Sequence, residues 1–231
     1  MIDDKLYDYA MVTFIDILDG GSKKQDKVLD RICAYITYQY DCYNSKYHNC
    51  RHIVDVVDKL EKYIFETDDC EHQHEMRMAL LLHDVIYDVP CFGGMTNEMK
   101  SAAIFDKFVV KLVPELRDHI DCHLVSDLIL STQYGTEFEA TEADEPEYQL
   151  IHDIDFSSLG ESFERFCHDG RNIRKEYWMA TDEEFEIGRV AFLQSMLAKP
   201  RIYLTDYYFD KYEDMTRSNM KAYLVEAHFS A

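Results

Sequence analysis

The sequence contains few of the residues that interrupt helices. Only 8 glycines and 4 prolines occur among 231 residues, and alternation of apolar and polar residues with a period of two is scarce. Apolar residues instead recur at helical spacing along most of the chain. This pattern excludes a β-sandwich or β-barrel and predicts an all-α fold, with less than about a tenth of the residues in strands.

Basic residues are also few. The chain has 24 lysines and arginines against 45 aspartates and glutamates, for a net charge of -21. Such a field repels phosphate polymers, so we expect no binding to DNA or RNA. A small phosphorylated molecule remains compatible with this charge, because a cation bound in a pocket dominates the local potential.

Long hydrophobic runs and paired cysteines are missing as well. No apolar run reaches about 18 residues, so we expect no membrane span, and the acidic start "MIDDKLYDYA" lacks the features of a signal peptide. The seven cysteines form no C-x-x-C pair, which indicates free thiols in a reducing compartment. We therefore expect a soluble cytoplasmic protein; its oligomeric state has no signature in the sequence.

Apolar periodicity and capping residues predict a series of helices. Two capping boxes, Ser22 with Gln25 and Thr181 with Glu184, mark helix starts. The acidic segment 135–147 predicts an exposed loop and not a domain boundary. The expected helices cover residues 7–18, a second segment through 28–40, 52–65, about 73–87, 97–112, a segment from Pro114 through 133, two segments after 160, and about 206–228.

The stretch "LLLHDVIYD" places His83 and Asp84 inside an almost unbroken apolar run. Burial of an unpaired carboxylate is costly, so such a group shifts its pKa, finds a partner or binds a metal. The pair is therefore either a structural hydrogen-bonded couple or half of a metal site.

Two further segments offer the missing ligands. "YHNCRHI" carries His48 and His52, four residues apart at the entry to an amphipathic helix, and "DIDFSSLG" carries Asp153 and Asp155. Imidazole and carboxylate together make a mixed nitrogen and oxygen site, which suits Mn, Fe, Ni, Co or Zn better than Mg. Spacing alone does not choose between the two histidines. His52 directly precedes the apolar stripe of its helix, whereas His48 lies a turn earlier, where it reaches over a pocket mouth.

Taken in order, these segments resemble the H…HD…D signature of the HD superfamily of metal-dependent phosphohydrolases. The similarity is closer to a branch of predicted metal-dependent HD phosphohydrolases, whose motifs recur at 47–53 (YHNxxHI), 83–88 (HDxxYD), 97–102 (NExxSA), 153–160 (DxDxxxLG), 173–177 (IRKEY) and 188–189 (GR). The resemblance implies one HD-domain helical bundle over residues 1–231. Its signature-bearing core covers about 45–230, and helices within 1–44 pack on that core.

The resemblance also implies the chemistry. One divalent metal (Mn, Co, Ni, Fe, Zn or Mg) activates water for hydrolysis of a phosphate ester or anhydride in a small substrate, above all a nucleotide. The implied metal ligands are His52, His83, Asp84 and Asp155. Asp84, Asp88 and His48 are the implied catalytic residues, with Asp88 one turn beyond Asp84 and positioning water. Substrate contacts are assigned to Glu98, Arg174 and Arg189.

One departure from the family pattern limits the metal count. Gly135 stands where relatives carry a histidine after "STQY", so we expect one metal ion and not two. His119 and His123 have ligand spacing, but their acidic neighbours predict a solvated face. Two alternatives stay open: an HD-fold di-iron oxygenase, which needs a second metal, and a catalytically inactive HD fold that acts as a binding or inhibitory protein.

Overall fold

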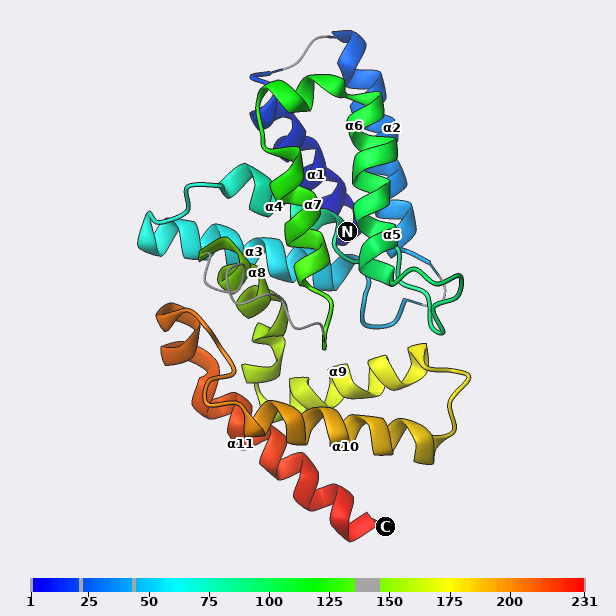
Figure 1. Ribbon diagram of the computed structural model, residues 1–231, viewed down its shortest axis with the longest axis vertical. Coiled ribbons are helices and arrows are strands. Elements are labelled where there is room, and N and C mark those ends of the chain that lie inside the picture. Colours follow the sequence, from blue (N-terminus) through cyan, green and yellow to red (C-terminus); the bar gives the residue numbers. More distant parts are fainter. Residues whose placement is uncertain (1, 21–22, 43–44, 136–145, 231) are drawn as a thin grey trace.

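The chain folds into α-helices joined by turns, as seen in a computed structural model (Figure 1). The structure describes residues 2–20, 23–42, 45–135 and 146–230. Within these ranges no residue belongs to a strand, which confirms the predicted all-α class. Most of the expected acidic loop, and Ser22 of the first expected capping box, lie outside the described residues. None of the described helices combines the length and apolar character needed to cross a membrane.

The helices follow the predicted order with one addition, because residues 146–156, which include Asp155, form a helix that is not among those expected. Their bounds are α1 Ile2–Ile17, α2 Lys23–Tyr40, α3 Cys50–Thr67, α4 Gln73–Leu82, α5 Asn97–Ile104, α6 Val110–Leu112, α7 Cys122–Ser131, α8 Pro146–Phe156, α9 Phe163–Glu176, α10 Asp182–Ala198 and α11 Asp206–Ser230. A π-helical turn at Phe105–Val109 links α5 to α6, and short 3-10 turns occupy Pro114–Asp118 and Ser157–Gly160. The capping box of Thr181 and Glu184 is present at the start of α10, as predicted.

Helix α4 ends earlier than predicted, at Leu82 instead of about residue 87. The phenol of Tyr40 donates to the carbonyl of Leu81, and the ring of His83 donates to the carbonyl of Leu80. Beyond this turn, the backbone N–H of Ile86 donates to the hydroxyl of Ser101 on α5. Side chains thus satisfy backbone groups that a longer helix would pair internally, and the chain turns away from the helix axis.

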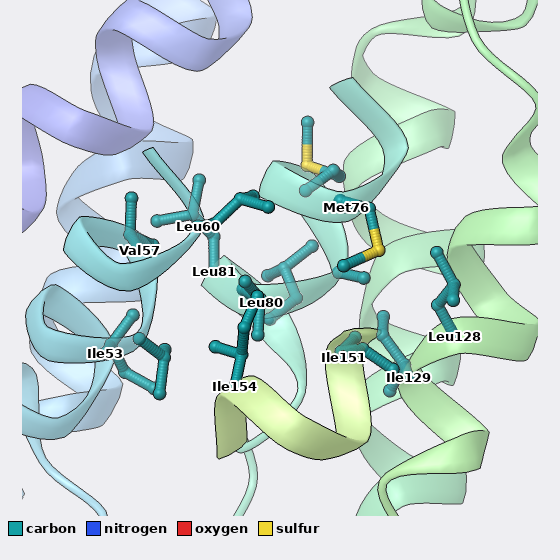
Figure 2. Packing of buried hydrophobic residues seen from close by; sticks show 14 of the residues in the cluster. Ile53, Val57, Leu60, Met76, Leu80, Leu81, Leu128, Ile129, Ile151 and Ile154 are labelled. Carbon is teal, nitrogen blue, oxygen red and sulfur yellow. The ribbon is translucent and has the colours of Figure 1, made fainter. Parts of the chain in front are cut away.

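The core is built around α4 (Figure 2). Fully buried residues of this helix pack between α3, α7 and α8, and the side chains that meet there include Ile53, Val57, Leu60, Met76, Leu80, Leu81, Leu128, Ile129, Ile151 and Ile154. Each such side chain contributes about 1.5–3 kcal/mol through burial. The His83-Asp84 pair therefore lies at the end of a deeply buried helix.

Helices α9, α10 and α11 form a second layer below this core in Figure 1, where α9 and α10 run antiparallel. Helix α11 approaches the 3-10 turn closely at Gly160. A Cβ atom there would lie 2.7 Å from the Cβ of Tyr212 and 2.8 Å from Oγ1 of Thr216, so only glycine fits. This contact fixes the second layer against the end of α8, which carries Asp155.

A candidate metal centre beside an aromatic cavity

The predicted metal ligands converge from three parts of the fold. His52 comes from the first turn of α3, His83 and Asp84 from the turn after α4, and Asp155 from the last turn of α8. The Nε2 atoms of His52 and His83 lie 3.3 Å apart. Oδ1 of Asp155 lies 3.3 Å and 3.6 Å from these two nitrogens, and Oδ2 of Asp84 lies 3.6 Å and 3.1 Å from them.

These separations fit ligands that share one ion. Two atoms each about 2.1 Å from a metal lie about 3.4 Å apart in a tetrahedral site and about 3.0 Å apart as neighbours in an octahedral one. The Nδ1 atom of His83 donates to the carbonyl of Leu80 at 2.9 Å, which leaves Nε2 of the neutral ring as the electron-pair donor. His52, His83 and Asp155 form a buried group whose ligand atoms all lie within 4.8 Å of one another and that could hold a metal ion.

The electrostatics of the group favour positive charge at its centre. Burial by itself lowers the pKa of His83, but the carboxylates of Asp84 and Asp155 outweigh it and raise that pKa well above its ordinary value. Burial by itself raises the pKa of Asp155, but hydrogen bonds and charge from His52 and His83 outweigh it and hold the pKa of this carboxyl well below its usual range. Two ionised carboxylates beside two buried imidazoles thus form a site for a cation or for protons.

A cavity of about 420 Å³ opens beside the group, and Asp84 and Asp155 are part of its wall. This volume lies within the roughly 300–1,000 Å³ of small-molecule sites. Much of the remaining wall is aromatic. Its aromatic residues lie before α3, after α4, after α7, on α8, after α9 and on α10: Tyr47, Tyr87, Tyr134, Phe156, Tyr177, Phe185 and Phe192. Two of the four candidate ligands, Asp84 and Asp155, therefore face a space large enough for a small organic molecule with a planar ring.

His48 lies in the cavity wall and apart from the four converging side chains. Its Nδ1 atom lies 2.7 Å from Oε2 of Glu176, and its ring stacks on Tyr87 with centroids 3.6 Å apart. Burial by itself lowers the pKa of His48, but Asp84 and Glu176 outweigh it and raise that pKa. Of the two histidines that spacing left open, His52 is the one whose nitrogen joins the group.

Arg189 on α10 is the cation of this cavity wall: among the described residues that line the cavity, no other arginine or lysine occurs. Its guanidinium lies over the rings of Phe166, Phe192 and Tyr223, at 5.3, 5.5 and 5.9 Å from their centroids. The buried Nε atom has no hydrogen-bond partner within the described part of the chain. Burial lowers the pKa of Arg189. A donor buried without an acceptor is a position where a ligand oxygen would be stabilised.

Arg174, the other arginine that we expect to contact substrate, does not line this cavity. Its guanidinium donates to the carbonyls of Tyr177 and Ala180 and pairs with Asp182 at 2.7 Å. These bonds close the turn between α9 and α10. The hydrogen bonds hold the side chain at that turn, and it is not part of the cavity wall.

Asp88 is also placed differently from the prediction. Because α4 ends at Leu82, Asp88 lies not on a helical turn after Asp84 but in an exposed loop. Its carboxylate pairs with Lys100 at 2.9 Å, and it is not among the residues that line the cavity. The structure gives no support for a water-positioning role of Asp88.

Other candidates from the sequence are placed as follows. Glu98, in the first turn of α5, lines the cavity. Gly135 lies just after α7 with a φ of 81°, beyond the wall residues Thr132 and Tyr134. His119 and His123 are exposed, as predicted. Of the expected substrate contacts, Glu98 and Arg189 reach the cavity.

The sequence does not reveal the structural roles of two buried carboxylates, Asp153 and Glu176, that shape the site. Asp153 is fully buried and accepts hydrogen bonds from the N–H groups of Leu204 and Thr205 and from the Thr205 hydroxyl. Glu176 binds the segment before α3. The motifs "DxD" and "IRKEY" contain both residues, but only the tertiary structure separates the anchoring Asp153 from Asp155, which joins the metal group.

Comparison of the chain with protein-family models, with curated proteins and with solved structures gives no match.

Proposed function

We propose that the protein is an HD-type metal-dependent phosphohydrolase that cleaves a phosphate ester or anhydride of a small substrate, above all a nucleotide. The observation that carries this proposal is the convergence of His52, His83, Asp84 and Asp155 at the wall of a cavity. Arg189, whose buried Nε atom has no hydrogen-bond partner among the described residues, lies in that same wall. Metal ligands and a cation that share one cavity are the two features that recognition of a phosphate requires.

The cavity wall supports the choice of a nucleotide. Phosphate oxygens would accept hydrogen bonds from Arg189, whose planar fork matches that group. A base would stack on the aromatic wall that includes Tyr134 and Phe192. The carboxylate of Glu98, also in the wall, would accept hydrogen bonds from ribose hydroxyls or base amino groups.

A bound divalent ion would lower the pKa of its water ligand into the range of a nucleophile and offset charge on the phosphate. Side chains of the protein supply the metal ligands and the contacts to the phosphate. His52, His83, Asp84 and Asp155 hold the ion. Arg189 stabilises the negative charge that grows on the phosphate oxygens in the transition state, and His48 contacts the substrate from the cavity wall.

The experiment is a screen of nucleotides and generic phosphate esters with Mn²⁺, Co²⁺, Ni²⁺, Zn²⁺ or Mg²⁺, with and without chelator. Phosphate release should depend on the added metal and stop in chelator. The matched variants are His52→Ala and His48→Ala. His52→Ala should lose bound metal and turnover together, whereas His48→Ala should keep the metal and lose turnover or substrate affinity.

Four results would count against the proposal. Full turnover in chelator excludes a metal-dependent reaction. Metal loss in His48→Ala but not in His52→Ala reverses the ligand assignment. Tight binding of a nucleotide with no hydrolysis under any metal favours the inactive binding protein, and two ions per chain favour the di-iron oxygenase. An exposed residue, His119, provides the control substitution, and His119→Ala should behave as the wild type.

A further inference from the structure

Glu176 is a buried carboxylate in an unfavourable place. It is the last residue of α9 and only 3% exposed, where the partial negative charge of the helix C-terminus opposes it. Hydrogen bonds from residues 46–48, far away in the sequence, compensate for the burial of this carboxylate. Oε1 accepts from the backbone N–H groups of Lys46, Tyr47 and His48 at 2.7, 2.7 and 3.0 Å, and Oε2 lies 2.7 Å from Nδ1 of His48.

The other contacts of His48 fix the plane of its ring. The ring stacks on Tyr87 with an interplanar angle of 18°, and its contact with the Tyr47 ring is edge-on, at 4.8 Å and 87°. The hydroxyl of Tyr47 is itself bound to Ser158 at 2.8 Å. With Glu176 on one edge and Tyr87 on one face, the imidazole has one orientation.

The bond to Glu176 also selects the tautomer. An ionised carboxylate only accepts, so Nδ1 of the neutral ring carries the proton and Nε2 carries the lone pair. The pKa of Glu176 agrees with an ionised group: burial by itself raises it, but His48 and the backbone N–H groups outweigh burial and lower it. Within the described part of the chain, Nε2 of His48 has no hydrogen-bond partner, and the side chain lines the cavity.

We infer that Glu176 is a positioning residue, which holds His48 in the Nδ1–H tautomer so that the Nε2 atom is presented to the substrate as a hydrogen-bond acceptor. This inference rests on the proposed function, since it assigns an atom to the substrate contact of His48. In the neutral ring, at a pH above the raised pKa of His48, this atom would accept a hydrogen bond from a protonated phosphate oxygen, a hydroxyl or a water molecule in the cavity.

The substitution Glu176→Gln separates this role from a purely structural one. The amide oxygen of glutamine still accepts from the three backbone N–H groups, so the segment before α3 keeps its anchor. The amide NH₂ then faces Nδ1 of His48 and donates, which requires the opposite tautomer, with the proton on Nε2. The shape of the side chain is unchanged, but the atom presented to the cavity becomes a donor.

The test begins with nitrogen-15 NMR of His48 in the metal-free protein, at a pH where the ring is neutral. The wild type should show a proton on Nδ1, and Glu176→Gln should show it on Nε2. The second measurement is steady-state kinetics with metal and a phosphate ester that the wild type hydrolyses. Glu176→Gln should lower kcat by about 10–100-fold. Its metal content and its KM should stay within about twofold of the wild-type values. In a His48→Ala background the same change should lower kcat by no more than about twofold. The exposed Glu164 of the same helix provides the control Glu164→Gln.

The inference is overturned if the wild-type ring carries its proton on Nε2, or if both proteins show the same tautomer. It is also overturned if Glu176→Gln lowers kcat equally in the presence and absence of His48. The NMR result does not depend on turnover. Failure of the proposed function would appear separately, as hydrolysis that persists in chelator or does not occur at all.

Discussion

At the scale of single residues, Arg189 is a side chain that we expect to contribute more to ligand binding than to the stability of the fold. Its buried Nε atom lacks a hydrogen-bond acceptor among the described residues. A buried donor without an acceptor costs about 1–3 kcal/mol, which offsets the contacts of the guanidinium with three aromatic rings. We predict that Arg189→Met leaves the free energy of unfolding unchanged or raises it by about 1 kcal/mol. The same variant should lower kcat/KM for a phosphate ester by about 10–100-fold, because a charged hydrogen bond to phosphate is lost. Urea denaturation and steady-state kinetics measure the two effects.

Arg174 provides the matched comparison. It makes three hydrogen-bonded contacts at the α9–α10 turn and lies outside the cavity wall. Arg174→Met should therefore lower the free energy of unfolding by about 1–2 kcal/mol and leave kcat/KM nearly unchanged. If Arg174→Met lowered turnover while Arg189→Met lowered only the free energy of unfolding, the proposal that the phosphate binds beside Arg189 would be contradicted.

The ionisation of Glu176 makes the stability of the folded protein depend on pH. Its folded-state pKa lies below the ordinary 4.5, so the folded state binds fewer protons than the unfolded state in that range. The resulting stability is present above about pH 4.5 and is lost as the pH falls through the folded-state pKa. The stability advantage of the wild type over Glu176→Gln should therefore shrink below pH 4.5. Parallel denaturation curves between about pH 3 and pH 7 test this, and a constant difference would contradict it.

At the scale of helices, much of the structure follows from local sequence. Apolar residues at helical spacing predict α1, α3 and α11, and Thr181 with Glu184 predicts the start of α10. The end of α4 is different, because it depends on Tyr40 from α2 and Ser101 from α5. Neither partner is near in sequence, so periodicity extends the helix to about residue 87 and misplaces Asp88.

In the candidate site, too, some features follow from local sequence and others depend on the tertiary structure. Burial of His83 and Asp84 follows from the apolar run that contains them, and the motif order supplies His52 and Asp155 as partners. The commitment of Arg174 to a turn, and the role of Glu176 as an acceptor for residues 46–48, depend on how α9 meets the segment before α3. Charge and spacing alone do not distinguish Arg174 from Arg189.

Asp153 sets the position of one element against another. Its carboxylate, fully buried in α8, accepts hydrogen bonds from residues that directly precede α11. We predict that Asp153→Asn lowers the free energy of unfolding by about 2–3 kcal/mol, because one oxygen acceptor becomes a donor that faces other donors. Urea denaturation measures the loss. Asp210→Asn on the exposed face of α11 is the control, with an expected change within about 0.5 kcal/mol; equal effects of the two changes would contradict the anchoring role.

The whole molecule carries a net charge of -21, and like charges repel one another most strongly in the compact state. Raising sodium chloride from about 0.01 M to about 1 M shortens the screening length from about 30 Å to about 3 Å. We predict that this raises the melting temperature by about 2–4 °C, equivalent to about 1 kcal/mol for a chain of this length. Calorimetry in the presence of chelator excludes an effect of bound metal. A melting temperature that falls with salt would show that ion pairs outweigh the repulsion.

The central claim joins the metal group to catalysis, and one titration tests it directly. Metal-free protein receives Mn²⁺ in steps while phosphate release from a nucleotide or ester found in the screen is followed. The account predicts that the rate rises with added metal, levels off near one ion per chain and stays at background in Asp155→Asn. A rate that is already full in chelator, or that rises equally in Asp155→Asn, would contradict it.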